Sequence, residues 1–144
     1  VLSGTKIKRD GYLGFYDTQL TVIKEGNEQE FFGWALPGFN KFSMSKSYFS
    51  WLFPKRKYEI DTNMRGEERA YVVTGQYEKV LPMDIYPQQL IKAIMIEDID
   101  LMEKLGLYEV GPEDLALCEF VCTSKIEVQS IIRHGLDILR KENL

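Results

Sequence analysis

Two cysteines near the C-terminus have the spacing of half an iron–sulfur motif. Cys118 and Cys122 lie four residues apart, and one four-cysteine ligand pattern for such clusters reads C-x2-C-x2-C-x3-C-P. The pair matches the last two ligands of that pattern. The first two ligand positions fall on Pro112 and Leu115, which cannot bind iron, and Thr123 replaces the final proline. The pattern therefore indicates a cluster-binding frame that has lost its cluster.

The residue types leave three interpretations of the thiol pair open. Both cysteines can be core residues, because an unpaired cysteine behaves as a small hydrophobic side chain. They can form half of a metal site, but two further ligands are then needed, and the only histidine, His134, lies on the next predicted helix. A thiol-redox role is the third interpretation. We expect core packing, with Cys118 and Cys122 as vestigial ligand positions and no metal, cofactor or catalytic residue in this chain.

Composition and motifs exclude several classes of function. The net charge of −4 and the pI near 5.1 argue against nucleic acid as the main partner. The densest carboxylate run, over residues 97–103, is expected to be a solvated helix face rather than a cation site. The sequence has no phosphate-binding loop, zinc-protease motif or nucleophile elbow. Nothing in the residues predicts a catalytic centre.

The hydropathy and cysteine content indicate a compartment. Uninterrupted apolar runs are only a few residues long, as at 93–96, so no segment is expected to span a bilayer. Two cysteines four apart on one helix make a poor disulfide pair, which favours a reducing, cytosol-facing compartment. Because the chain opens with Val1, we expect it to be part of a longer polypeptide.

One segment is a candidate docking surface. Between Tyr48 and Tyr58, aromatic side chains and a leucine stand beside three consecutive cations. This composition is typical of contact with a neighbouring protein of a complex or with a membrane surface, although it is too short for stable anchoring alone. The alternative is that the aromatics pack under a β-layer and the cations form a solvated linker. The candidate contact residues are Phe49, Trp51, Phe53, Lys55, Arg56 and Lys57.

The elements that must position these residues differ between the two halves. Residues 1–82 have short β-branched and aromatic runs separated by turn signals such as Glu25-Gly26-Asn27, which predict hairpins. A helix is expected within 43–53. The predicted strands are Gln19–Lys24, Phe31–Leu36, Lys57–Thr62, Ala70–Val73 and Glu78–Leu81.

After Pro82 the apolar period changes to 3.6, which predicts helices. The first begins near Pro87, the second ends at Gly106 and the third begins at Pro112. Ser124 and Glu127 have the spacing of a capping box for the last helix. The predicted fold class is α+β, with a small β-rich lobe over 1–82 and a helical lobe over 83–144.

Several motifs in one order carry a resemblance to a known family. They are GYLGFY at 11–16, FGWALPG at 32–38, NKFS at 40–43, GQYEKVLPMD at 75–84 and DLALCEFVC at 114–122. With these motifs the chain resembles the C-terminal part of the A subunit of the Na⁺-translocating NADH:quinone oxidoreductase, and its helical half is also similar to the cluster-carrying C subunit of the Rnf electron-transport complex. In the Rnf segment a cluster cysteine stands where this chain has Leu81.

The resemblance implies a fold and a setting. It implies a β-grasp-like N-terminal half and a ferredoxin-type helical half without clusters. It also implies a peripheral subunit on the cytoplasmic face of the bacterial inner membrane, in a complex that oxidises NADH, reduces ubiquinone and exports Na⁺. Flavins and iron–sulfur centres would then belong to other subunits, some of them membrane-embedded. The expected role is assembly or docking. The alternative is a quinone-binding module whose aromatics, Phe32, Trp34 and Trp51, contact the ring.

Overall fold

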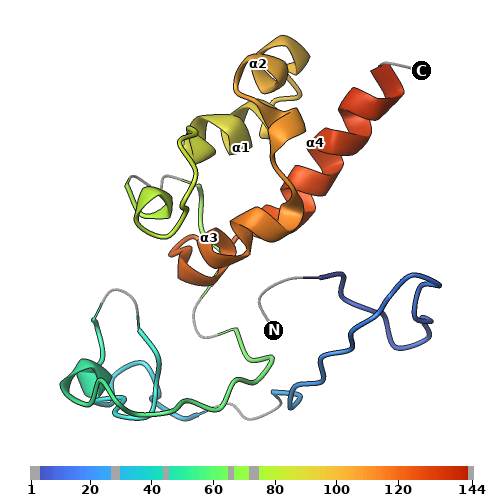
Figure 1. Cartoon of the computed structure of the whole chain (residues 1–144). Helices are drawn as coiled ribbons and strands as arrows, with labels where there is room; N and C mark the ends of the chain where they lie inside the picture. The colour runs from blue at the N-terminus through green and yellow to red at the C-terminus, as the bar shows by residue number, and fades with distance from the viewer. Residues whose placement is uncertain (1–3, 27–29, 44–45, 65–66, 72–74, 143–144) are drawn as a thin grey trace. The chain divides into compact units, whose positions relative to one another are not determined.

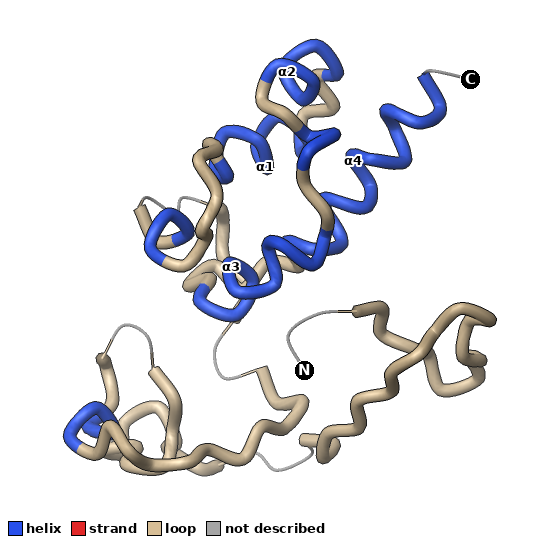
Figure 2. Tube along the Cα trace, viewed as in Figure 1, coloured by secondary structure: helices blue, strands red, loops and turns tan. Residues whose placement is uncertain are grey.

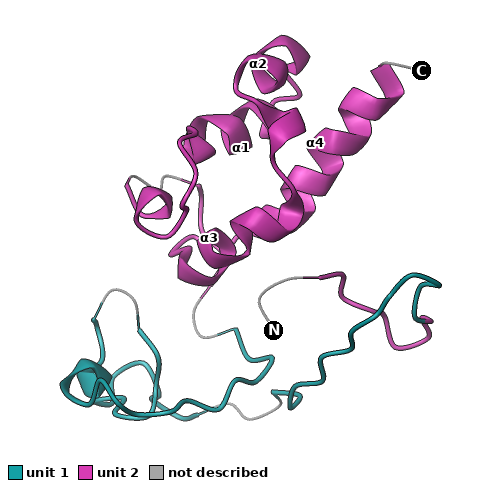
Figure 3. Ribbon diagram, viewed as in Figure 1, with its two compact units in different colours: residues 1, 13–66 teal, residues 2–12, 67–144 magenta. Residues whose placement is uncertain are grey.

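The chain forms two compact units, each of which has its own secondary structure. The structure, a computed structural model, describes residues 4–26, 30–43, 46–64, 67–71 and 75–142 (Figure 1). Unit 1 comprises residues 13–66 with Val1, and unit 2 comprises residues 2–12 and 67–144 (Figure 3). In the described ranges, no helix is both long and apolar enough to cross a membrane.

Unit 2 holds the α-helices of the described chain, joined by short 3₁₀ turns (Figure 2). The helix α4, at fifteen residues, is the longest of them. The α-helices are α1 (Pro87–Met95), α2 (Ile99–Lys104), α3 (Ala116–Val121) and α4 (Val128–Glu142); the 3₁₀ turns are η2 (Tyr77–Lys79), η3 (Leu107–Glu109) and η4 (Pro112–Leu115).

The predicted helix boundaries in unit 2 are mostly confirmed. Pro87 is the first residue of α1, where its fixed φ suits a helix start. Gly106 follows α2 with a φ of 81°, a left-handed conformation that glycine adopts without a steric penalty. The third element differs from the predicted continuous helix, because its first turn, from Pro112, is 3₁₀.

The start of α4 is stabilised differently from the predicted capping box. The Ser124 hydroxyl donates to the carbonyl of Ala70 at 3.2 Å, and the Ser124 carbonyl accepts the Arg69 N–H at 2.9 Å. The Glu119 carboxylate, from α3, accepts the backbone N–H of Gln129 at 2.8 Å. A negative charge near a helix N-terminus is favourable, so α3 supplies the capping group for α4, and Ser124 ties the segment before η2 to unit 2.

The core of unit 2 forms where α1, η3 and η4 pack on α4. The side chains of Leu90, Ile94 and Leu107 are fully or almost fully buried there, as are Ile132 and Leu139 of α4. This burial confirms most of the apolar stripes that the 3.6-residue period predicts, but Met95, which the period also assigns to the stripe of α1, is exposed.

Gly135 is the point of closest approach inside this core. A Cβ atom at Gly135 would lie 2.9 Å from Ile94 Cγ1 and 3.0 Å from Leu107 Cδ2. Both distances are too short for ordinary carbon contact. The absence of a side chain therefore lets α4 approach α1 and η3.

We predict that Gly135→Val lowers the free energy of unfolding of unit 2 by about 1–3 kcal/mol, because the added carbons overpack the core. The better helix propensity of valine offsets only a few tenths of that loss. Urea unfolding followed by circular dichroism at 222 nm measures the change. Ser130→Val, at an exposed position of α4, is the control. An equal loss in both variants would show that overpacking is not the cause.

Unit 1 overturns the predicted fold class. Its described residues contain no β-strand, only an isolated parallel bridge between Lys24 and Asp61 and the 3₁₀ turn η1 (Phe49–Leu52). The prediction of a β-rich, β-grasp-like first half is therefore wrong: the part of the chain that the structure describes is mostly helical and coil. The helix expected within 43–53 is only the turn η1, with residues 44–45 outside the described ranges.

Local hydrogen bonding explains why the predicted strands do not form. In the segment predicted as the strand Phe31–Leu36, the N–H groups of Ala35 and Leu36 both donate to the Phe32 carbonyl, which folds the segment into a turn. The predicted strand Glu78–Leu81 overlaps η2. Residues 72–73 of the predicted strand Ala70–Val73 lie outside the described ranges. The buried residues in the described part of unit 1 are Gly33, Lys41 and Ser50. The apolar alternation in the sequence thus has no buried face to stabilise a sheet.

Candidate functional site

The two cysteines lie in the core of unit 2. Cys118 is within α3, Cys122 follows its last residue, and both are buried free thiols. The hydroxyl of Tyr77, from η2, donates to Cys122 Sγ at 3.0 Å. Burial, with a smaller contribution from the charge of Glu78, raises the pKa of the Cys118 thiol to about 11. Cys118 is therefore a protonated thiol near neutral pH.

Apolar residues occupy two of the positions where the cluster-binding relatives or patterns have cysteine, and they lie beside the thiols. Leu115 and Leu81 belong to the same buried cluster as the cysteines. Among the residues that the structure describes, no group of three or more His, Cys, Asp or Glu side chains is arranged to hold a metal. His134 lies elsewhere, with its Nε2 atom 3.4 Å from the Glu97 carboxylate.

We predict that the folded chain protects both thiols from a water-soluble aromatic disulfide reagent. Thiolate is the reactive form, and reaction at these buried positions requires local opening of the core. The rate at neutral pH should therefore be at least about a hundredfold lower than in denaturing urea. Rapid reaction of two thiols in the native chain would contradict the core-packing interpretation.

The candidate residues Phe32 and Trp34 line a hollow in unit 1. Its volume is about 360 Å³, and Glu30, Phe31, Phe32 and Trp34 form its walls. The rings of Phe32 and Trp34 are 6.1 Å apart, and Phe31 meets Phe32 edge-on at 4.6 Å. This arrangement presents aromatic faces beside one carboxylate.

A buried lysine organises the loop that carries these rings. The Lys41 ammonium donates to the Gly33 carbonyl at 2.6 Å, pairs with the Glu30 carboxylate and lies 5.4 Å from the Tyr48 ring centroid. A buried ammonium is stable only with such partners. The ammonium thus links the two ends of the loop, and sequence reasoning missed it, because its partners lie seven to eleven residues away.

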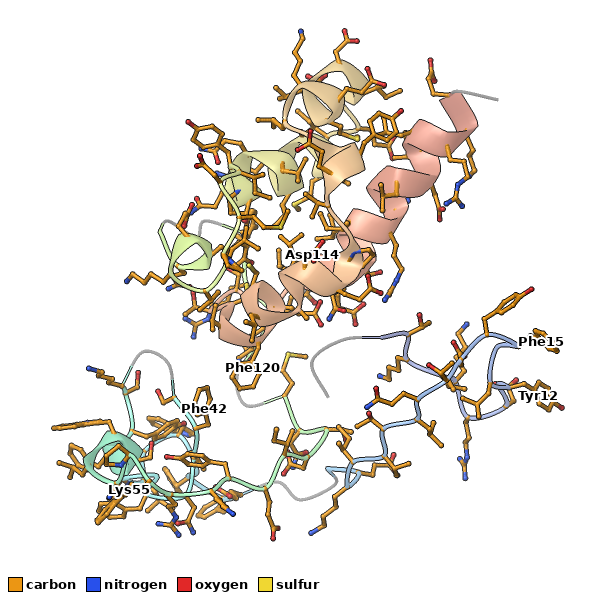
Figure 4. All side chains as sticks on the ribbon, in the orientation of Figure 1. Tyr12, Phe15, Phe42, Lys55, Asp114 and Phe120 are labelled. Atoms are coloured by element: carbon orange, nitrogen blue, oxygen red, sulfur yellow. The ribbon has the colours of Figure 1, made fainter. Side chains whose placement is uncertain are left out.

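The second group of candidate residues lies in η1 and in the segment that follows it. Phe39 lies 6.2 Å from Phe49 and 6.3 Å from Phe53, measured between ring centroids. The Arg56 guanidinium donates to the Phe39 carbonyl at 3.3 Å, and Figure 4 shows Lys55 close to η1. We call this surface the aromatic–basic patch; it consists of Phe39, Phe49, Trp51, Leu52, Phe53, Lys55, Arg56 and Lys57.

The structure thus places four of the predicted contact residues in two ring clusters of unit 1, Phe32 and Trp34 in one and Phe49 and Phe53 in the other. Phe31 and Phe39 belong to these clusters and were missed by sequence reasoning. Phe31 adjoins a predicted residue, so adjacency could have indicated it. Phe39 follows Pro37-Gly38, where Gly38 has a φ of 60°, so a turn signal could have indicated that the chain reverses there.

Unit 2 has a hollow of its own that the sequence did not indicate. Its volume is about 340 Å³, and α1, α4 and the residues after α1 line it with Ile94, Met95, Glu97, Ser130, Ile131 and His134. The His134–Glu97 pair stands at this hollow and is exposed. Two side chains do not complete a metal site.

The chain matches no protein-family model, but several curated proteins are similar to it. It is 47% identical over 131 residues to the A subunit of the Na(+)-translocating NADH-quinone reductase of Rhodopirellula baltica, and the match covers 91% of this chain and 29% of that protein. It is 43% identical over 143 residues to the protein of the same name in Shewanella frigidimarina, covering 99% and 32%. The protein from Haemophilus influenzae is 44% identical over 148 residues, covering 99% and 33%.

The chain is homologous to part of the A subunit of these reductases. The family resemblance indicated by the sequence motifs is therefore confirmed. The chain spans about a third of the length of the curated relatives it matches. The match covers both ring clusters and the buried thiols, since it includes 99% of the chain in two of these relatives.

Proposed function

We propose that this chain is a peripheral, cofactor-free part of a Na⁺-translocating NADH:quinone oxidoreductase, and that it holds partner subunits in place instead of carrying electrons. The names of its relatives support membership of that complex. The protonated, buried Cys118 supports a packing role for the vestigial ligand positions. Its expected location is the cytoplasmic face of the bacterial inner membrane, against subunits that include membrane-embedded ones.

The observation that carries the docking role is the aromatic–basic patch. Half of the Trp51 surface is exposed, at 51%, and Phe49 and Phe53 are exposed to the same degree. Trp, Phe and Arg are enriched at the centres of protein interfaces. Within the described ranges, no carboxylate pairs with Lys55, Arg56 or Lys57, so the positive charges of these side chains are not neutralised there and complement a partner's acidic groups.

Cross-linking in the intact complex tests this role. A photo-reactive amino acid at Trp51 should give adducts with other subunits of the complex. The same amino acid at Tyr86, which is exposed on unit 2, serves as the comparison position. Adducts from Tyr86 alone, or none from Trp51, would contradict docking through the patch.

The cofactor-free part of the proposal has a separate test. The purified chain should be colourless and hold no stoichiometric iron. About four iron atoms per chain, with an absorbance that dithionite bleaches, would overturn it.

A second candidate function is quinone contact, which the hollow beside Trp34 favours. Its three aromatic walls could stack on a quinone ring, and Trp34 is 79% exposed. In a Trp51→Phe background, Trp34 is the remaining tryptophan, so its fluorescence reports on that hollow. A quinone analogue should quench it saturably; no saturation up to the order of tens of micromolar would count against this function.

A further inference from the structure

We propose that the aromatic–basic patch binds the surface of a bilayer rich in anionic phospholipid. This inference deepens the docking role and rests on the proposed function only for bringing the chain to a membrane. The patch itself supplies both parts of the recognition: exposed apolar rings and unpaired cations within one short stretch of unit 1.

The first supporting observation is a separation of charge along the chain. Between Phe31 and Tyr58 the sequence has five Lys or Arg residues and no Asp or Glu, although the whole chain has a net charge of −4. One of the five, Lys41, is buried and neutralised by Glu30. The other four are exposed: Lys46, Lys55, Arg56 and Lys57. Such a local excess of positive charge on an acidic protein complements an anionic surface.

The second observation is the apolar surface beside these cations. Phe39, Phe49 and Phe53 form one ring cluster, and the Arg56 side chain is fixed to the Phe39 carbonyl. Trp51 and Leu52 are about half exposed in the same stretch. Aromatic rings, above all Trp, favour the headgroup region of a bilayer, and Lys and Arg favour its anionic edge.

The third observation favours a lipid surface as a contact of the patch. From Phe49 to Lys57, two neutral side chains have a hydrogen-bonding group: Trp51 and Ser50. Ser50 is only 3% exposed. A protein interface normally includes about one hydrogen bond for each 100–200 Å². Apart from the Lys and Arg donors and the indole N–H, the stretch offers no exposed polar side chain, and a bilayer surface with its phosphate groups complements rings and cations without a matched set of neutral partners.

The strength of this contact follows from the number of cations. Each Lys or Arg close to an anionic membrane strengthens binding about fivefold. Lys55, Arg56 and Lys57 together therefore contribute on the order of a hundredfold. Because the charges are exposed, salt at about 0.5 M should release the chain.

Vesicle sedimentation with the full chain tests the proposal. The chain should sediment with vesicles of phosphatidylglycerol and phosphatidylcholine in equal parts at low salt, and not with phosphatidylcholine alone. In a Trp34→Phe variant, the fluorescence of Trp51, then the only tryptophan, should shift to shorter wavelength on binding. No sedimentation with the anionic vesicles at low salt would overturn the proposal.

Matched variants separate the patch from overall charge. Lys55→Gln/Arg56→Gln/Lys57→Gln should weaken vesicle binding on the order of a hundredfold. Lys55→Gln/Lys57→Gln, which keeps the Arg56 bond to Phe39, should weaken it by about 25-fold. The control, with the same change in net charge, replaces the exposed unit 2 residues Lys104, Arg140 and Lys141 with Gln and should bind as the unchanged chain does. Equal losses in the two triple variants would overturn the proposal.

The lipid contact and the docking role fail separately. Trp51 adducts with other subunits, in a chain that does not bind anionic vesicles, would overturn the lipid proposal and leave docking intact. Vesicle binding without cross-links from Trp51 to other subunits would overturn docking through the patch and support the lipid proposal. Far-UV circular dichroism of each variant verifies that the helices of unit 2 are unchanged.

Discussion

Replacing Ile132 with alanine should lower the free energy of unfolding of unit 2 by about 2–5 kcal/mol. Ile132 is 0% exposed and belongs to the continuous core cluster of unit 2. The substitution removes buried carbons and leaves a cavity that neighbours fill only in part. Urea unfolding monitored at 222 nm gives the change, with the slope of the transition as a check that the unfolding remains two-state.

The matched control removes the same atoms where they are exposed. Ile96→Ala, at the end of α1, changes a side chain that is 70% exposed, so the expected change is within about 0.5 kcal/mol. Similar losses in the two variants would mean that Ile132 is not packed in the way the structure shows.

Alkaline pH should destabilise unit 2 through two buried groups. Burial raises the pKa of Cys118 from 9.0 to about 11. It also raises the pKa of Tyr77, with a further contribution from the hydrogen bond donated to Cys122. Below pH 9 both groups are protonated in the folded and the unfolded chain, so their stabilising effect is fully present. Above pH 9 the unfolded chain loses protons that the folded chain retains, and stability falls.

The expected slope is about 1.4 kcal/mol per pH unit for one such group, and about twice that once both titrate in the unfolded chain. The total free energy of unfolding of a protein is usually about 5–15 kcal/mol. A rise in pH from 9 to 11 should therefore remove a large part of the stability of unit 2. Urea unfolding across this range measures it. A Cys118→Ala/Tyr77→Phe variant should have a flatter profile; an unchanged profile, or constant stability of the unaltered chain up to pH 11, would refute the assignment.

The helical unit was largely predictable because its signals are local. Pro87 marks the start of α1 and Gly106 marks the end of α2, through backbone constraints that act within a few residues. The apolar stripe of α4 needs only the 3.6-residue period. The capping of α4 was not predictable in this way, because the group that caps it, Glu119, comes from another helix.

The first half was not predictable because strands depend on partners distant in sequence. Thr21, Val22 and Ile23 have high strand propensity, but propensity measures fit to a packed sheet surface rather than a backbone preference. In the structure this segment makes one bridge, from Lys24 to Asp61. The turn at Phe32 then satisfies backbone groups locally, and no ladder forms in the described part of the segment.

The candidate contact residues were predictable by type and not by arrangement. Aromatic and basic residues at 49–57 indicate a surface for a partner or a membrane. Their grouping depends on Phe39 and Arg56, which the chain brings together across 17 residues. No pattern in the sequence indicates that Phe39 and Arg56 come into contact.

Tyr77 sets the minimum length of an isolated helical fragment. Its ring is fully buried and its hydroxyl reaches Cys122, although η2 precedes the first α-helix of unit 2. A truncated product that starts at α1 would expose the underside of α3 to water. A cloning boundary at or before residue 67 keeps the ring, together with the Arg69 and Ala70 bonds to Ser124, and is the one from which a soluble fragment is expected.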